Sequence, residues 1–150
     1  MKLAIGSDHA GYPLKPQLLE LLARLGHEVT DHGCHDTNPV DFPDIARKVC
    51  ADVLSGRADR GIMVCGTGVG AAIACNKVPG IRASVVHDIY TAHQSVEHDD
   101  VNVACIGAQI VGPVIAAEVL ERFLSARFST SEEFRRRVAK LAEMELDAKK

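Results

Sequence analysis

The sequence predicts an α/β fold: a three-layer sandwich in which helices cover both faces of a five-stranded parallel sheet, with an extra helix at the C-terminus. One observation is that short apolar runs alternate with longer segments that carry a helical apolar stripe. Another is that polar residues follow the ends of these runs. Repeated strand–helix units need right-handed crossovers, which place helices on both faces of a parallel sheet. At 150 residues, the chain is expected to form a single domain, 1–150, of Rossmann-like type.

Five segments are expected to be strands because they are short, mostly rich in Val, Ile or Ala, and end near Gly or Asp. In chain order they are residues 2–8, 27–33, 60–66, 81–88 and 101–109. Five others have apolar residues at helical spacing; in the first of them, two prolines fit the opening turn and leucines form the stripe. These expected helices are residues 13–25, 43–55, 70–77, 89–97 and 113–126.

Residues 130–150 predict the extra helix. Thr130 and Glu133 have the spacing of a capping box, and an apolar stripe of Phe134, Val138 and Leu141 follows. A helix that follows a complete α/β domain either packs on its own sheet or docks on a second subunit. The sequence leaves both arrangements open.

The composition excludes several classes of protein. The net charge is −3, aromatic residues make up 4% of the chain, and basic residues are scattered except at 135–137, so no nucleic-acid partner is expected. The apolar run before Asp8 is too short for a signal peptide or a membrane span, which predicts a cytoplasmic protein without a membrane partner. The five cysteines form no CxxC pair and are expected to be free, buried thiols.

The carboxyl ends of the expected strands predict the site, because ligands of parallel α/β sheets bind there. The third strand ends in the stretch CGTGVG at 65–70, whose three glycines expose backbone N–H groups to an anion. Cys65 stands beside the start of the next helix, whose dipole is expected to lower the thiol pKa and make it a base. A thiol base next to N–H donors suits proton abstraction beside a carbonyl, with the loop holding an enediolate.

This stretch has three other interpretations, of which one is excluded. GTGVGA fits the dinucleotide pattern, with Asp88 placed 22 residues past Gly66 as a ribose-binding acid, although it follows the third strand instead of the first. A nucleotide-triphosphate loop is excluded because Gly-Lys-Ser/Thr is absent. A tight turn without chemistry is the third. The cluster DHGCHD at 31–36 has no usual zinc spacing, so no metal site is expected.

Five motifs in fixed order resemble the ribose-5-phosphate isomerase B family, which includes the galactose-6-phosphate isomerase subunits. The match covers nearly all of residues 1–125 and consists of GSDHAG at 6–11, DFPDIA at 41–46, CGTGVG at 65–70, NKVPGIRA at 76–83 and EHDDVNV at 97–103. The resemblance implies a homodimer with shared active sites that uses neither metal nor organic cofactor. It also implies interconversion of aldose and ketose phosphates through a cis-enediolate.

The resemblance assigns roles by position. Cys65 resembles the base, the stretch 66–70 resembles the enediolate loop, and His98 resembles the group that opens the sugar ring. Because His98 lies shortly before the fifth strand, it is expected to reach the same edge of the sheet. The implied catalytic residues are Cys65, His98 and Thr67, and the implied substrate-binding residues are Asp8, His9, Gly66, Gly68, Val69, Gly70, Asp99, Gln109 and Arg137.

Departures from the family pattern bear on the substrate. Gln109 stands where the family commonly has a phosphate-binding arginine, and Glu133 and Phe134 stand where it commonly has an Arg-His pair. Arg137 matches a family arginine, and Arg135 or Arg136 would have to compensate for the others. The expected reaction is of the ribose 5-phosphate type. The alternatives are a tetrulose phosphate, a hexose phosphate or a non-phosphorylated sugar, an inactive partner subunit, and a nucleotide-binding module.

Overall fold

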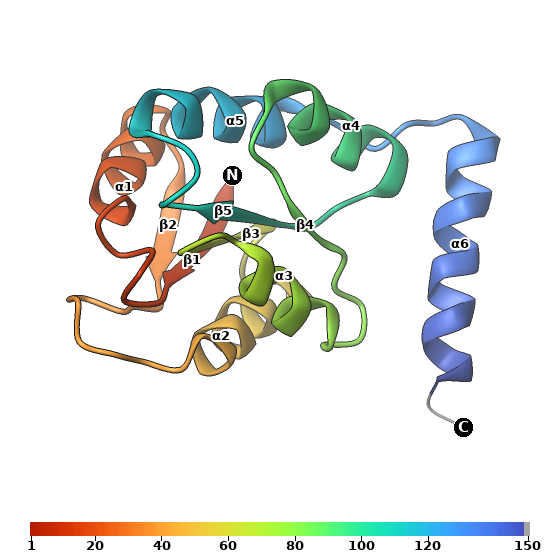
Figure 1. Cartoon of the computed structure of the whole chain (residues 1–150). Coiled ribbons are helices and arrows are strands. Elements are labelled where there is room, and N and C mark those ends of the chain that lie inside the picture. Colours follow the sequence, from red (N-terminus) through yellow and green to blue (C-terminus); the bar gives the residue numbers. More distant parts are fainter. Residues whose placement is uncertain (149–150) are drawn as a thin grey trace.

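A five-stranded parallel sheet forms the middle layer of the computed structural model, which describes residues 1–148 (Figure 1). The strand order is β2-β1-β3-β5-β4, so the chain first adds β2 on one side of β1, then crosses to place β3, β5 and β4 on the other side. The predicted sheet is therefore confirmed. Its strands are β1 (Lys2–Ser7), β2 (Glu28–Asp31), β3 (Arg60–Cys65), β4 (Ala83–Val85) and β5 (Val103–Gly107).

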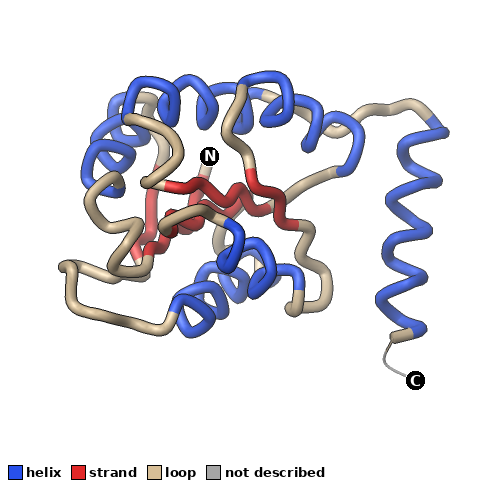
Figure 2. Tube along the Cα trace, in the orientation of Figure 1, coloured by secondary structure: helices blue, strands red, loops and turns tan. Residues whose placement is uncertain are grey.

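Helices cover both faces of the sheet, as Figures 1 and 2 show. Helices α1, α4 and α5 lie on one face and α2 and α3 on the other, while α6 stands beside this body. Helices α1 to α5 fall within two residues of their expected positions; α6 starts two residues after its expected start, and residues 149–150 of its expected range lie outside the described residues. The helices are α1 (Lys15–Arg24), α2 (Phe42–Leu54), α3 (Val69–Asn76), α4 (Ile89–Asp99), α5 (Pro113–Ser125) and α6 (Glu132–Asp147).

Strand β4 is shorter than the expected segment 81–88. It is an edge strand that pairs only with β5, and the Asn76 side chain hydrogen-bonds both backbone groups of Ala83 on the other side, at 2.8 Å each. A side-chain amide thus replaces a neighbouring strand. None of the helices in residues 1–148 is long and apolar enough to cross a membrane.

The core consists of two apolar layers, one on each face of the sheet. Leucines of α1 and α5 pack with Ile and Val of β1, β3 and β5 in one layer, and α2 and α3 close the other. The second layer contains a chain of hydrogen-bonded thiols. The pKa of the Cys50 thiol is raised by its hydrogen bond with Cys75 and by burial, and that of Cys75 is raised by its hydrogen bond with Cys105 and by burial. All five cysteines are free and buried, as predicted. The thiol chain runs from Cys50 through Cys75 to Cys105.

Helix α6 differs from the others because it has no buried residue. Its N-cap is Ser131, without a side-chain cap hydrogen bond, so the predicted capping box of Thr130 and Glu133 is wrong. The helix contacts α4, and Glu145 accepts hydrogen bonds from the Gly80 N–H at 2.9 and 3.0 Å. These contacts lie at the margin of the body, and most of the surface of α6 remains exposed (Figure 1).

Candidate active site

The carboxyl ends of β1, β3 and β5 bring the predicted chemistry together. The parallel register pairs Ser7 of β1 with Val64 of β3, and Cys65 of β3 with Gly107 of β5. Asp8 directly follows β1, and its backbone N–H donates to the Val64 carbonyl at 3.2 Å. The acid and the thiol, which are 57 residues apart in the chain, therefore become neighbours.

A buried pair of Cys65 and Asp8 forms the centre of this site. The Cys65 thiol donates to Asp8 Oδ2 at 2.9 Å, and Asp8 Oδ1 accepts from the Gly11 N–H at 2.8 Å. The two residues are 8% and 5% exposed. Because the backbone holds one carboxylate oxygen, the other is fixed toward the sulfur. This arrangement gives the thiol proton an acceptor within hydrogen-bond distance, so the pair can generate a thiolate.

The pKa of the Cys65 thiol differs from what the sequence predicts. Burial raises the pKa of the Cys65 thiol, and the hydrogen bond and negative charge of Asp8 raise it further. The backbone N–H groups of Gly66 and Gly68 lower it, but they do not outweigh the other causes. The expected lowering of the pKa by the helix dipole is therefore wrong. The free thiol is held protonated, in a form ready to transfer its proton to Asp8.

The substitution Asp8→Asn is expected to lower the pKa of the Cys65 thiol, because it removes the negative charge next to the sulfur. The thiolate is the nucleophile, so alkylation by iodoacetamide increases as the pH rises through the thiol pKa. In the variant this increase should occur at lower pH than in the wild-type protein. Cys65→Ala protein supplies the background from the other thiols. An increase at the same or higher pH would contradict the contribution of Asp8.

The glycine loop is shaped by two close backbone contacts. Gly68 has φ of 80° and is the N-cap of α3, a conformation that favours glycine. A Cβ on Gly107 would lie 2.7 Å from the Thr67 carbonyl, so only glycine lets the loop rest on the end of β5. The Thr67 side chain is exposed, as is that of Val69. The loop is thereby presented at the surface beside the buried thiol.

Gln109 covers one side of this loop. Its backbone N–H donates to the Gly66 carbonyl at 2.9 Å, and a Cβ on Gly66 would lie 3.1 Å from the Gln109 Oε1 atom. The position that the resemblance assigned to a phosphate-binding arginine is thus beside the loop. It carries a neutral carboxamide, which makes a single-point contact where a guanidinium would bind an oxyanion with two parallel hydrogen bonds.

Two histidines also belong to this edge of the sheet. The Val40 N–H donates to His9 Nδ1 at 3.3 Å, and the Gly107 N–H donates to His87 Nε2 at 2.9 Å. Burial lowers the pKa of His87, so its imidazole is neutral and Nε2 is an acceptor. His87 follows β4 closely in the chain. Its position at the end of β4 was the signal that linked it to the site.

His98, Asp99 and Arg137 are not at this edge. His98 and Asp99 end α4, shortly before β5 starts, and the start of β5 pairs Val103 with Gly61 at the far end of β3. Cys65 lies four positions after Gly61 along β3, which is a distance of about 13 Å along the strand. The expectation that His98 reaches the edge of Cys65 within one chain is therefore wrong, because a residue before a parallel strand lies at its amino end.

Two of these residues, His98 and Arg137, belong to a second group around the start of α6. The His98 imidazole stacks on the Phe134 ring, with centroids 4.0 Å apart and an interplanar angle of 12°. Its Nδ1 atom lies 2.9 Å from the Gln94 amide nitrogen. The Arg137 guanidinium lies 5.6 Å from the centroid of the Phe134 ring. An aromatic, an imidazole and a cation thus share one surface at the amino edge of the sheet.

Other candidate residues have structural partners. Both carboxylate oxygens of Asp88 accept from Thr91, at 2.7 and 2.6 Å, so Asp88 is the N-cap of α4, which argues against its role as a ribose-binding acid. Within the cluster 31–36, Asp31 accepts from the buried Lys15 at 2.7 Å, and His32 contacts Asp52 on α2 at 2.6 Å. These side chains go to different partners instead of converging on one centre.

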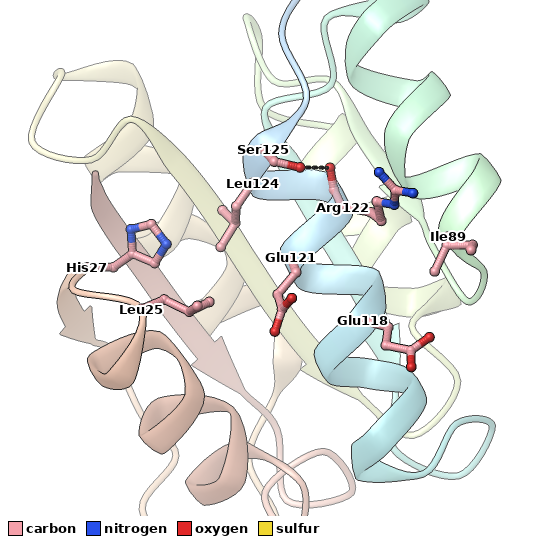
Figure 3. A pocket seen from close by; sticks show the side chains of 8 residues that line it. All are labelled: Leu25, His27, Ile89, Glu118, Glu121, Arg122, Leu124 and Ser125. Carbon is pink, nitrogen blue, oxygen red and sulfur yellow. Dashed lines mark hydrogen bonds between the residues drawn. The ribbon is translucent and has the colours of Figure 1, made fainter.

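A separate cavity of about 580 Å³ lies between the end of α1 and α5 (Figure 3). Its two sides are formed by Leu25 and His27 and by residues of α5, with Glu121 directed into the space between them. It includes neither Cys65 nor any residue of the glycine loop. No sequence motif indicates this cavity, and we assign it no part in the chemistry of Cys65.

Comparisons with known proteins agree with this architecture. The model of a family described as Ribose/Galactose Isomerase matches residues 3–141. Ribose-5-P isomerase B of Listeria innocua is 42% identical over 129 residues, covering 86% of this chain and 87% of that protein. D-erythrulose-4-phosphate isomerase of Pectobacterium atrosepticum is 38% identical over 130 residues, covering 85% of each chain. The structure of Clostridium thermocellum ribose-5-phosphate isomerase B has a TM-score of 0.96 and 44% identity over 99% of both chains.

The fold and the relatives, whose sequences match most of this chain, define the class of protein, which is a sugar-phosphate isomerase. The chain belongs to the Ribose/Galactose Isomerase family. The resemblance that the five sequence motifs carry is thereby confirmed.

Proposed function

We propose that this protein is an aldose–ketose isomerase that interconverts ribose 5-phosphate and ribulose 5-phosphate through a cis-enediolate. The observation that carries the proposal is the buried hydrogen bond between Cys65 and Asp8 beside the glycine loop. It joins a proton-transfer group to N–H donors that suit a developing oxyanion. Relatives named for ribose-5-phosphate isomerisation support the choice of substrate.

In the proposed mechanism, the Cys65 thiol first passes its proton to Asp8. The thiolate then removes the proton from C2 of the open-chain aldose, and that electron pair forms the C1–C2 double bond. The negative charge on O1 is held by N–H groups of the stretch 66–70. The thiol then returns its proton to C1 while a proton moves from O2 to O1, which leaves a C2 ketone. Finally Asp8 returns its proton to the Cys65 sulfur, which restores the starting pair. No metal or organic cofactor takes part in these steps.

Ring opening requires a second copy of the chain in this proposal. Cys65 and His98 lie at opposite edges of the sheet, so one chain supplies two halves of different sites. We propose a homodimer in which His98, Asp99 and Arg137 of one copy face Cys65, Asp8 and His9 of the other. Exposed apolar residues on α3, Val69 at 52% and Ile73 at 57%, adjoin the glycine loop and are suited to such an interface.

The residues available to bind the phosphate group of the substrate differ most from the family pattern. Gln109 offers no charge at the loop, and Glu133 lies 3.8 Å from Arg137, which reduces the net charge of that cation's surroundings. Arg135 lies over Phe128 and Arg136 pairs with Glu132 at 3.4 Å. Arg137 matches a family arginine and lies over the ring that stacks on His98, so it is the cation that the proposal assigns to phosphate. A four-carbon phosphosugar is the second candidate, because it needs fewer contacts and one relative is named for it.

Isomerase activity on a panel of tetrose, pentose and hexose sugars, each with and without phosphate, tests the proposal. We expect the highest kcat/KM with ribose 5-phosphate. A preference for erythrulose 4-phosphate would make Gln109 a determinant of chain length and favour the second candidate. Activity on unphosphorylated sugars alone would contradict the role of Arg137. Absence of turnover by the purified protein, with activity gained on mixing with a related subunit, would indicate a partner subunit.

A further inference from the structure

One aromatic ring contacts both groups that the proposed mechanism places at the amino edge of the sheet. Phe134 stacks on His98 with centroids 4.0 Å apart, and the guanidinium of Arg137 lies 5.6 Å from the same centroid. The ring lies in the first turn of α6, half-buried between this helix and α4. A residue that touches both groups is able to fix their relative position.

The orientation of the His98 imidazole depends on this ring. The Nδ1 atom of His98 lies within hydrogen-bond distance of the Gln94 amide nitrogen, at 2.9 Å. Its Nε2 atom lies 3.7 Å from a Glu97 carboxylate oxygen, which is beyond hydrogen-bond distance. One hydrogen bond leaves an imidazole able to turn about the line of that bond. The nearly parallel stack, at 12°, restricts this rotation.

The position of Arg137 depends on the same ring. Helix α6 has no buried residue, and its described contacts with the body are few. Arg137 is 60% exposed and its other partner is Glu133 on the same helix, at 3.8 Å. Contacts within a helix do not place it relative to another element. Glu145 ties the far end of α6 to Gly80, and at the start of the helix the stack of Phe134 on His98 is the contact that places Arg137 relative to the imidazole.

We infer that Phe134 is a positioning residue that holds the ring-opening imidazole of His98 and the phosphate-binding guanidinium of Arg137 in a fixed relation. This inference rests on the proposed isomerase function. Phe134 acts through these residues and does not itself take part in proton transfer.

The first test compares Phe134→Ala with Phe134→Tyr, using ribose 5-phosphate. Loss of the ring is expected to lower kcat about threefold to tenfold and to raise KM by a similar factor, as expected for loss of an aromatic contact. Phe134→Tyr keeps the stack and should remain within about twofold of the wild type in both constants. Phe128→Ala is the matched control, since it removes a half-buried ring near the same helix, next to Arg135. A similar loss in the control would overturn the inference.

Double-mutant cycles separate positioning from a general loss of structure. In a His98→Ala background, the effect of Phe134→Ala on kcat should disappear, and in an Arg137→Ala background its effect on KM should disappear. Each partner must be present for the ring to act through it. Independent, multiplicative effects in both backgrounds would show that Phe134 does not act through these residues.

A measurement without substrate keeps this inference distinct from the proposed function. The carbon-bound protons of the His98 ring lie over the Phe134 ring, so their NMR signals should be shifted upfield by its ring current. In Phe134→Ala these signals should move downfield, and in Phe134→Tyr they should stay. If the wild-type protein turns over no sugar, the proposed function fails while this shift still tests the stack. Unchanged His98 signals in Phe134→Ala would overturn the inference.

Discussion

Replacing Cys65 with alanine is expected to lower turnover of the best sugar substrate by about 10²- to 10⁴-fold, the range typical of a lost acid–base group. The thiol is 8% exposed and its polar partner is Asp8, so the substitution removes the proton carrier and leaves the carboxylate in place. Steady-state kinetics give the loss in kcat, and KM should change little because the loop and His9 remain. Thermal unfolding should show a nearly unchanged fold.

Cys34→Ala is the matched control for this experiment. Cys34 is a buried thiol, 7% exposed, whose contacts are the Ser7 hydroxyl at 3.7 Å and the Asp36 carbonyl at 3.2 Å. It has the same size and a similar burial but is not paired with Asp8. Its substitution should leave turnover within about threefold of the wild type. Near-normal turnover of Cys65→Ala would exclude Cys65 as the base.

Mixing two inactive variants is expected to restore activity. Cys65→Ala and His98→Ala each damage a different half of the proposed shared site. A mixed dimer contains one site with both substitutions and one with neither. With random exchange of subunits, half of the dimers are mixed, so about one quarter of the wild-type activity should return. The measurement is kcat per site before and after the two variants are mixed and equilibrated.

The control for this mixing experiment is a pair of variants that damage the same half. Cys65→Ala mixed with Asp8→Asn should recover no activity. One copy of the chain supplies both Cys65 and Asp8 to a site, so every site in a mixed dimer retains one of the two substitutions. Recovery in this pair would indicate an artefact of mixing. No recovery with His98→Ala, in a protein shown to exchange subunits, would contradict the shared site and require Cys65 and His98 to act in one chain.

The sequence predicts the fold and half of the site for the same physical reason. In a parallel sheet, residues that follow a strand gather at one edge, so Asp8, Cys65 and Gln109 come together as expected. His98 precedes a strand, and the same rule places it at the opposite edge. The expectation for His98 was wrong because nearness to a strand in the chain was taken as nearness to its carboxyl end.

Two further errors come from contacts that local sequence does not contain. The pKa of Cys65 is set mainly by burial and by Asp8, 57 residues earlier, whereas the sequence showed only the adjacent helix start. The N-cap of α6 is Ser131, one residue after the expected Thr130. Three consecutive residues, Ser129, Thr130 and Ser131, are all good N-caps, so residue type alone could not select among them.

The lack of buried side chains on α6 has a consequence for how this protein changes over evolution. Substitutions at exposed helix positions usually alter stability by less than about 0.5 kcal/mol, whereas Gly107 and Cys65 are confined by the packed sheet. In the proposed site, groups that meet the distal end of a sugar lie on α6 and those that carry out the proton transfer lie on the sheet. Exposed positions of α6 such as Glu133 can therefore change, and with them the preference for a substrate, while the fold and the proton-transfer groups of the sheet are retained.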